Sequence, residues 1–209
     1  HHQNEKQLRD NGIPYSSFGL IWRKFGRQFI SMFVEDNIDT IFEDIDTKFV
    51  QDVDIGDNGV QTDHTKFITH RHSFSRLISG GVRDNAEFED TSRVIKRILI
   101  NMVTSINKRI ESEKHLEYII ENEYDGNGVL VSDKPIDSLP TTIKEGIFFV
   151  VCPDDDSANW RIKTIRVNPW SFENRKPLWS AAGGLTGREL EEVTSIPGMV
   201  FCHSALFLA

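Results

Sequence analysis

Apolar residues recur at helical spacing in three parts of the chain. In residues 17–34 the apolar positions fall three, four and seven apart, directly after a serine pair that can cap a helix. The same spacing over 36–53 predicts a second helix that ends at a glycine shortly afterwards. A third apolar stripe predicts a long helix over 88–114. We expect the aromatic-rich faces of the first two helices to form core.

The pattern changes from helix to strand after about residue 117. Short apolar runs bounded by turn residues then predict strands, and the run over 160–167 alternates with a period of two. A short helix near 187–193 is expected to precede a last strand at 199–202. The sequence therefore predicts a mixed α/β fold. The other expected strands are 118–120, 128–131 and 146–151.

Composition narrows the possible functions. The chain has 209 residues, 38% of them hydrophobic, and a net charge of -8, which argues against avid non-specific binding to duplex nucleic acid. Acidic character still fits a nuclease whose carboxylates hold metal ions. Two cysteines favour a reducing, intracellular compartment, expected to be cytoplasmic in a bacterium and nuclear or mitochondrial in a eukaryote. No apolar run is long enough to predict a membrane span.

The first candidate site combines two N-terminal histidines with two aspartates. Imidazole and carboxylate groups suit divalent ions such as Mn²⁺, and two such ions can drive phosphoryl displacement. His1 and His2 are adjacent, and Asp54 and Asp57 lie about fifty residues later. The alternative is that residues 57–59 form an ordinary turn after a helix.

The second candidate site lies in the C-terminal part. Arginine makes bidentate contacts with phosphate oxygens, and a glycine pair allows close backbone approach. In the alternative interpretation Arg175 pairs with an acid such as Glu173, and His203 is a satisfied buried imidazole. The candidate substrate-binding residues are Arg161, Arg175, Lys176, Gly183, Gly184 and His203.

Two further patterns are weak. Three histidines, at positions 64, 70 and 72, have no cysteine pair nearby and are expected to be exposed rather than zinc ligands. Cys202 beside His203 is a poor nucleophile–base pair, because adjacent residues in a strand point to opposite faces.

Several segments together resemble one known family. His1-His2-Gln3, residues 11–22 and residues 49–59 resemble the Asp-His-His-Gln motif and later motifs of the melanocyte-proliferating-gene (MYG) family, which belongs to the DHH phosphoesterases. Residues 160–162, 171–178 and 195–203 resemble successive C-terminal signatures of the same family.

The resemblance implies roles for individual residues. His1 and Asp54 would be metal ligands, with Asp54 bridging two ions and Asp57 the second choice. His2 would contact the substrate phosphate and share in metal binding, and His2 and Asp57 would be the catalytic residues. The implied cofactor is a pair of divalent ions, Mn²⁺ or alternatively Mg²⁺.

The resemblance also implies a fold and an activity. Residues 1–85 would complete a DHH-type catalytic domain, 86–116 would be a linking helix, and 117–209 would be a small α+β substrate-binding domain. The implied activity is a 3′–5′ exoribonuclease on single-stranded or short RNA. The alternatives are a phosphohydrolase of small nucleotides or pyrophosphate, and a non-catalytic binding fragment. By this resemblance the chain would open inside the first motif, so we expect it to be inactive alone.

Overall fold

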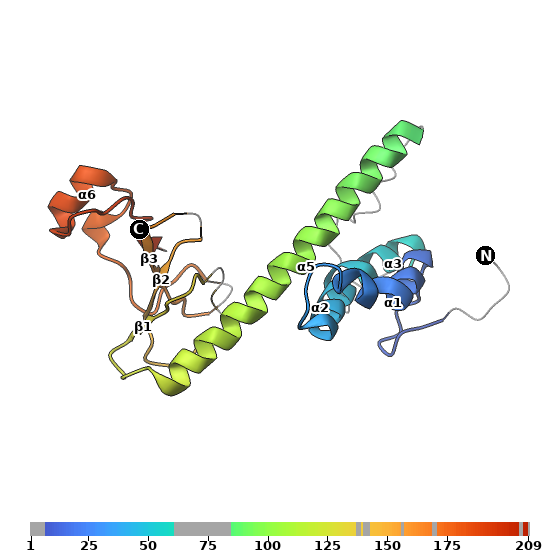
Figure 1. Cartoon of the computed structure of the whole chain (residues 1–209), viewed down its shortest axis with the longest axis horizontal. Coiled ribbons are helices and arrows are strands. Elements are labelled where there is room, and N and C mark those ends of the chain that lie inside the picture. The colour runs from blue at the N-terminus through green and yellow to red at the C-terminus, as the bar shows by residue number, and fades with distance from the viewer. Residues whose placement is uncertain are drawn as a thin grey trace. The chain divides into compact units, whose positions relative to one another are not determined.

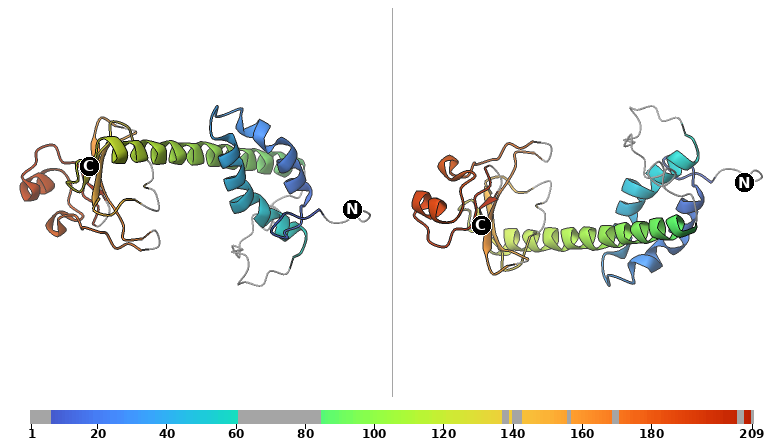
Figure 2. Two further views of the ribbon diagram at one scale, coloured as in Figure 1. Left: turned by 90° about the horizontal axis from the view of Figure 1, so that it is seen from below. Right: turned by 90° about the horizontal axis from the view of Figure 1, so that it is seen from above.

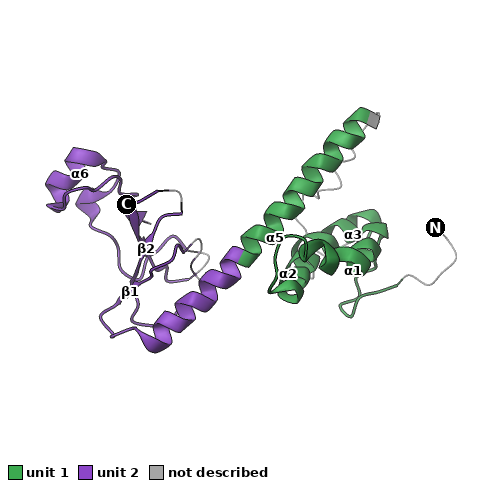
Figure 3. Cartoon of the chain, in the orientation of Figure 1, with its two compact units in different colours: residues 1–107 green, residues 108–209 purple. Residues whose placement is uncertain are grey.

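The computed structural model describes residues 7–60, 85–136, 139, 143–155, 157–168, 171–204 and 207–208 (Figure 1). The chain divides into two compact units, residues 1–107 and 108–209 (Figure 3). The division falls inside helix α5 (Asn85–Asn122), which both views of Figure 2 show as one uninterrupted helix. The division thus falls within the segment that was expected to link two domains.

The described part of unit 1 is helical. Helix α1 (Ser17–Ile30) begins at Ser16, whose hydroxyl accepts a hydrogen bond from the Phe18 amide at 3.2 Å. Helix α2 (Ile38–Ile45) continues through a π-helical turn, η1 (Asp46–Val50), into helix α3 (Gln51–Asp57). The single helix expected over 36–53 is therefore continuous in the chain but changes its hydrogen-bonding pattern in the middle.

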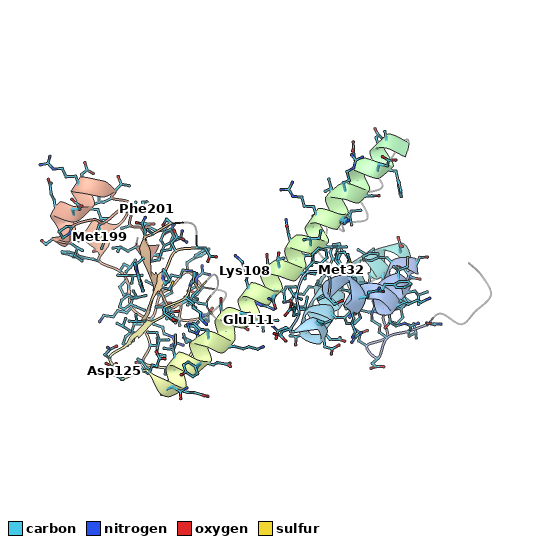
Figure 4. All side chains as sticks on the ribbon, viewed as in Figure 1. Met32, Lys108, Glu111, Asp125, Met199 and Phe201 are labelled. Atoms are coloured by element: carbon cyan, nitrogen blue, oxygen red, sulfur yellow. The ribbon has the colours of Figure 1, made fainter. Side chains whose placement is uncertain are left out.

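The core of unit 1 uses only part of the predicted apolar face. Trp22 is buried and stacks on Phe42, with ring centroids 5.5 Å apart. Ile21, Phe25 and Met32 are instead 57%, 47% and 71% exposed, so the expectation that the whole stripe is core was wrong (Figure 4). The stripe on α1 is wider than the surface that α2 and α3 cover.

Unit 2 is built on a mixed sheet of order β1-β2-β3-β4. Strand β1 (Val129–Val131) pairs in parallel with β2 (Phe149–Pro153), and β3 (Trp160–Thr164) and β4 (Phe207–Leu208) follow in antiparallel pairing. Helix α6 (Gly187–Thr194) and a short 3₁₀ turn, η2 (Ser180–Ala182), complete the described elements. The mixed α/β character predicted from the sequence is confirmed.

Hydrophobic clusters cover both faces of this sheet. Leu130 and Val150 are register partners in a cluster that includes Leu116 and Ile119 of α5. Ile162 pairs with the neighbour of Val150, so it lies on the opposite face, where the cluster around α6 packs. Met199 belongs to this second cluster, and the adjacent Phe201 is visible in Figure 4.

Two predicted strands were wrong. Residues 118–120 lie in the last turns of α5, because Ile119 belongs to the helical face that covers the sheet. Residues 199–202 form isolated bridges through Phe201 and Cys202 rather than a strand. The edge strand is instead β4, which begins five residues after Cys202, and its two residues are too few for a detectable alternating pattern.

Candidate active site

The carboxylate of Asp54 is the centre of the first predicted site. Asp54 lies on α3 and is fully buried. Its Oδ1 accepts hydrogen bonds from the Ser16 amide at 3.1 Å, the Gly19 amide at 3.0 Å and the Ser16 hydroxyl. Asp54 thus binds the N-terminal end of α1, where a helix has unpaired amides and favours negative charge.

Glycine is required at position 19 by this contact. A Cβ built on Gly19 would lie 1.9 Å from Asp54 Oδ2 and 2.7 Å from its Cγ. Any side chain at this position would displace the carboxylate. The two motifs that surround Gly19 and Asp54 in the sequence are therefore complementary in space.

Arg9 joins two acidic residues beneath this contact. Its side chain is 6% exposed. Its Nη1 lies 2.7 Å from Asp54 Oδ2, and the two groups form an ion pair that lacks the geometry of a hydrogen bond. It also donates to both oxygens of Asp46, at 3.0 and 2.9 Å. Burial acts to lower the pKa of Arg9, but the hydrogen bonds to Asp46 and the negative charges of Asp46 and Asp54 outweigh it and raise that pKa. Arg9 is therefore a permanent cation held between two carboxylates.

The π-helical turn η1 brings these carboxylates into register. Asp46 and Asp54 are eight positions apart, whereas two turns of an α-helix take about 7.2 residues. A π-helical turn contains an extra residue, so the eight positions between Asp46 and Asp54 span two turns and place both side chains on one face. Both side chains consequently reach the same guanidinium.

The turn after α3 leaves one carboxylate accessible. The Asn58 side chain donates to the carbonyl of Asp54 at 2.9 Å and to that of Pro14 at 3.4 Å, which holds the helix end against the N-terminal segment. Asp57 is exposed, and its carboxylate has no partner among the described residues. Among the described residues, Asp57 is thus an exposed carboxylate of this motif, whereas Asp54 is buried.

The predicted metal ligands are only partly assembled in the described chain. His1 and His2 lie outside the described residues, as do the histidines at 64, 70 and 72. Within the ranges that the structure describes, no group of three His, Cys, Asp or Glu residues could hold a metal ion. Asp54 has protein partners on both oxygens, and Asp57 alone does not make a metal site. The described residues therefore do not complete the expected two-metal centre.

Arg175 has a different environment from the one predicted for a phosphate ligand. Its guanidinium donates to three backbone carbonyls, those of Ile143, Lys144 and Ile147, at 2.8, 2.8 and 3.3 Å. Its own amide donates to Ile165 at 2.8 Å. These contacts tie the turn before β2 to the segment after β3, which supports the structural alternative, although with carbonyls in place of an acid.

The other predicted cations lie in two separate places. Lys176 is exposed beside Phe148, with Nζ 5.6 Å from the ring centroid. Arg161 pairs with Asp154 at 2.7 Å and lies 5.8 Å from the Phe207 ring. Burial acts to raise the pKa of Asp154, but the Ser157 hydroxyl and the Arg161 guanidinium outweigh it and lower that pKa.

His203 and the glycine pair take part in the packing near β4. The His203 ring stacks on Phe207, with centroids 5.5 Å apart, so His203 and Arg161 share this aromatic neighbour. A Cβ on Gly183 would lie 3.3 Å from the Ser204 Cα, and Gly184 has a φ of +81°. Both glycines are thus explained by local backbone geometry.

Cys202 is a structural thiol. It is fully buried in the cluster around α6, and burial raises the pKa of its thiol. A raised pKa disfavours the nucleophilic thiolate. This agrees with the rejection of a cysteine nucleophile from the sequence.

Sequence reasoning missed the residues that hold the first site together. Arg9 and Asp46 carry no motif, and their pairing spans 37 positions. The one available signal was the glycine of the 11–22 segment, since a glycine inside a helical pattern often marks a close approach.

Comparison with known proteins defines the class of the chain. A family model described as "Uncharacterised protein family (UPF0160)", with the model name MYG1_exonuc, matches residues 1–209, so the chain belongs to this family. The MYG1 exonuclease of Mus musculus is 25% identical over 223 residues, which cover 92% of the chain and 58% of the mouse protein. The MYG1 protein C27H6.8 of Caenorhabditis elegans is 26% identical, covering 92% and 65%.

A fission yeast relative extends the comparison. The MYG1 protein C694.04c of Schizosaccharomyces pombe is 23% identical and covers 100% of the chain and 73% of the yeast protein. The chain spans about three fifths of the length of the mouse and worm relatives. No solved structure matches the chain significantly. Among the described helices, none is both long and apolar enough to cross a membrane.

Proposed function

We propose that the complete protein is a divalent-metal-dependent phosphodiester hydrolase of the DHH type, and that it removes nucleotides from the 3′ end of single-stranded or short RNA. Family membership and the exonuclease names of the mammalian relatives support the reaction class. The choice of RNA, the direction of cleavage and the metal are parts of the proposal. Mn²⁺ is the proposed ion, with Mg²⁺ as the substitute.

The contact between Asp54 and the start of α1 carries this proposal. It fixes the segment that follows the His-His-Gln motif against the helix that ends at Asp57. Gln7 is held as well, because its side chain accepts from Arg23 at 2.7 Å and its carbonyl from Tyr15 at 2.9 Å. His2 precedes Gln7 by five positions, a chain length of at most roughly 18 Å.

Within this proposal the two aspartates have different roles. Asp57 is exposed and provides the carboxylate for the metal site together with His1, while His2 contacts the substrate phosphate. Asp54 positions the two segments, since both of its oxygens have protein partners. A bound divalent ion would supply charge stabilisation to a phosphoryl group.

The test uses protein expressed from the complete reading frame that encodes this chain. A 5′-labelled single-stranded RNA should be shortened stepwise from its 3′ end in the presence of Mn²⁺, and EDTA should abolish cleavage. Asp57→Asn should lower kcat/KM at least about a hundredfold, because a missing carboxylate weakens the metal centre. Asp36→Asn, which changes another exposed aspartate of unit 1, should leave the rate unchanged.

Three outcomes would overturn parts of the proposal. Cleavage that persists in EDTA would remove the metal dependence. Full activity of Asp57→Asn would remove its role in the site. Turnover of pyrophosphate or mononucleotides with no shortening of RNA would replace the exonuclease by a small-molecule phosphohydrolase.

A further inference from the structure

A further candidate site lies in unit 2, and its lining includes Trp160 of the 160–162 segment. A cavity of about 650 Å³ opens where α5 passes the end of β1. Helix α5 packs against this strand, since Leu116 and Ile119 of α5 share a hydrophobic cluster with Leu130 of β1. The cavity has the size of pockets that bind small organic ligands.

Three large apolar side chains line the cavity and remain exposed. Tyr118 of α5 is 56% exposed, Val131 of β1 is 57% exposed and Trp160 of β3 is 51% exposed. Two of these are aromatic and present flat faces. Aromatic faces are the surfaces on which planar rings stack, and each stacked base contributes substantially to binding.

A hydrogen-bonded group fixes the polar side of the cavity. His115 Nε2 lies 3.1 Å from both Ser132 Oγ and Asp133 Oδ1. The Ser132 hydroxyl donates to the Lys134 carbonyl at 2.6 Å, so its oxygen accepts from His115. His115 Nε2 therefore carries a proton and also holds Asp133, whose side chain is 81% exposed and keeps its second oxygen for a ligand.

The charge of the lining selects the class of ligand. Glu123 and Asp133 contribute two carboxylates to the lining, and Lys134 contributes one ammonium group. A lining with two carboxylates disfavours a free phosphate or polyphosphate. It favours a neutral ring with N–H donors, because carboxylates accept hydrogen bonds from the amino groups of bases.

We propose that this cavity binds a nucleobase that carries an exocyclic amino group, such as adenine or cytosine, stacked on Trp160 and donating to Asp133. Only the source of the base, a nucleotide of an RNA strand, rests on the proposed function. Binding of a nucleoside requires neither a metal ion nor cleavage.

The test compares adenosine with purine riboside, which has the same ring system without the amino group. Isothermal titration of the full chain should show adenosine binding roughly five- to 150-fold more tightly, the range for a good polar contact to a base. Asp133→Ala should remove this preference and leave the affinity for purine riboside unchanged.

Variants at tryptophan test the stacking contact. Trp160→Ala should weaken both nucleosides by roughly five- to 150-fold, the range for one lost stacking partner, whereas Trp160→Phe should keep most of the affinity. Trp179→Ala is the matched control, because Trp179 is 58% exposed and lies outside the cavity. It should change neither affinity.

Equal affinities for the two nucleosides, an unaffected Trp160→Ala, or no binding at millimolar nucleoside would each overturn the inference. Adenosine binding without RNA cleavage would support the cavity and refute the proposed function. RNA cleavage without adenosine binding would support the proposed function and refute the nucleobase site.

Discussion

The sharpest test of the first site is Asp54→Asn. The substitution keeps the shape of the side chain and one acceptor oxygen, but it removes the negative charge that faces Arg9. We expect it to lower the free energy of unfolding of unit 1 by about 2–4 kcal/mol. The loss should occur without any metal present, because the partners of Asp54 are protein groups.

The magnitude follows from the buried ion pair. Removing one partner of such a pair usually costs about 3–5 kcal/mol, since the other charge stays buried. Arg9 retains its two hydrogen bonds to Asp46, which reduces the penalty. The three bonds that Oδ1 accepts survive as neutral ones, roughly half as strong as charge-assisted bonds. These opposing changes place the expected loss at about 2–4 kcal/mol, slightly below the usual range.

Amide hydrogen exchange in EDTA buffer measures this change unit by unit. Peptides from α1 and α3 should lose protection in Asp54→Asn, while peptides from α6 serve as the internal reference. Asp36→Asn should change protection by less than about 0.5 kcal/mol, as expected for an exposed substitution.

Loss of less than about 1 kcal/mol in EDTA would refute the structural role of Asp54. If Asp54→Asn were less stable than the wild type only in the presence of Mn²⁺, Asp54 would be a metal ligand, as its motif first suggested. The structural role therefore predicts a loss of stability that does not depend on metal, whereas the ligand role predicts a loss that requires Mn²⁺.

The remaining predictions concern packing and one pKa. Gly19→Ala should destabilise unit 1 by about 1–3 kcal/mol in urea unfolding despite the better helix propensity of alanine, because its Cβ would overlap the carboxylate; wild-type stability would contradict this. Arg175→Lys should lower the stability of unit 2 by about 1–2 kcal/mol, since one ammonium cannot serve three carbonyls, and unchanged stability with slower RNA cleavage would restore the substrate role. Arg161→Gln should raise the pKa of Asp154 toward its ordinary value in a carboxyl NMR titration. Because the pKa of Asp154 is lowered in the folded state, the Asp154–Arg161 pair stabilises the fold above the ordinary pKa of an aspartate, and this stabilisation is lost as the pH falls through the lowered pKa. An unchanged titration of Asp154 in Arg161→Gln would show that Arg161 does not lower this pKa.

The amino-acid sequence determined the elements whose side chains repeat with a regular period. Helices α1 and α6 and strands β1, β2 and β3 lie within or close to the predicted ranges, because each has one face against a core. The period could not locate the end of α5, since residues 118–120 are an apolar run that suits a strand or a buried helix equally. Packing on the sheet decided that they are helical.

The functional assignment of the aspartates required the tertiary structure. The motif placed Asp54 and Asp57 in one segment, but it could not show which carboxylate is bound by other protein groups. Arg9 and Ser16 reach Asp54 across 45 and 38 positions, and such distant partners leave no mark in a local pattern. The sequence alone determined the family and the types of residue in the site, whereas the fold decided that Asp54 is enclosed and Asp57 is exposed, because only three-dimensional packing brings distant donors to one oxygen.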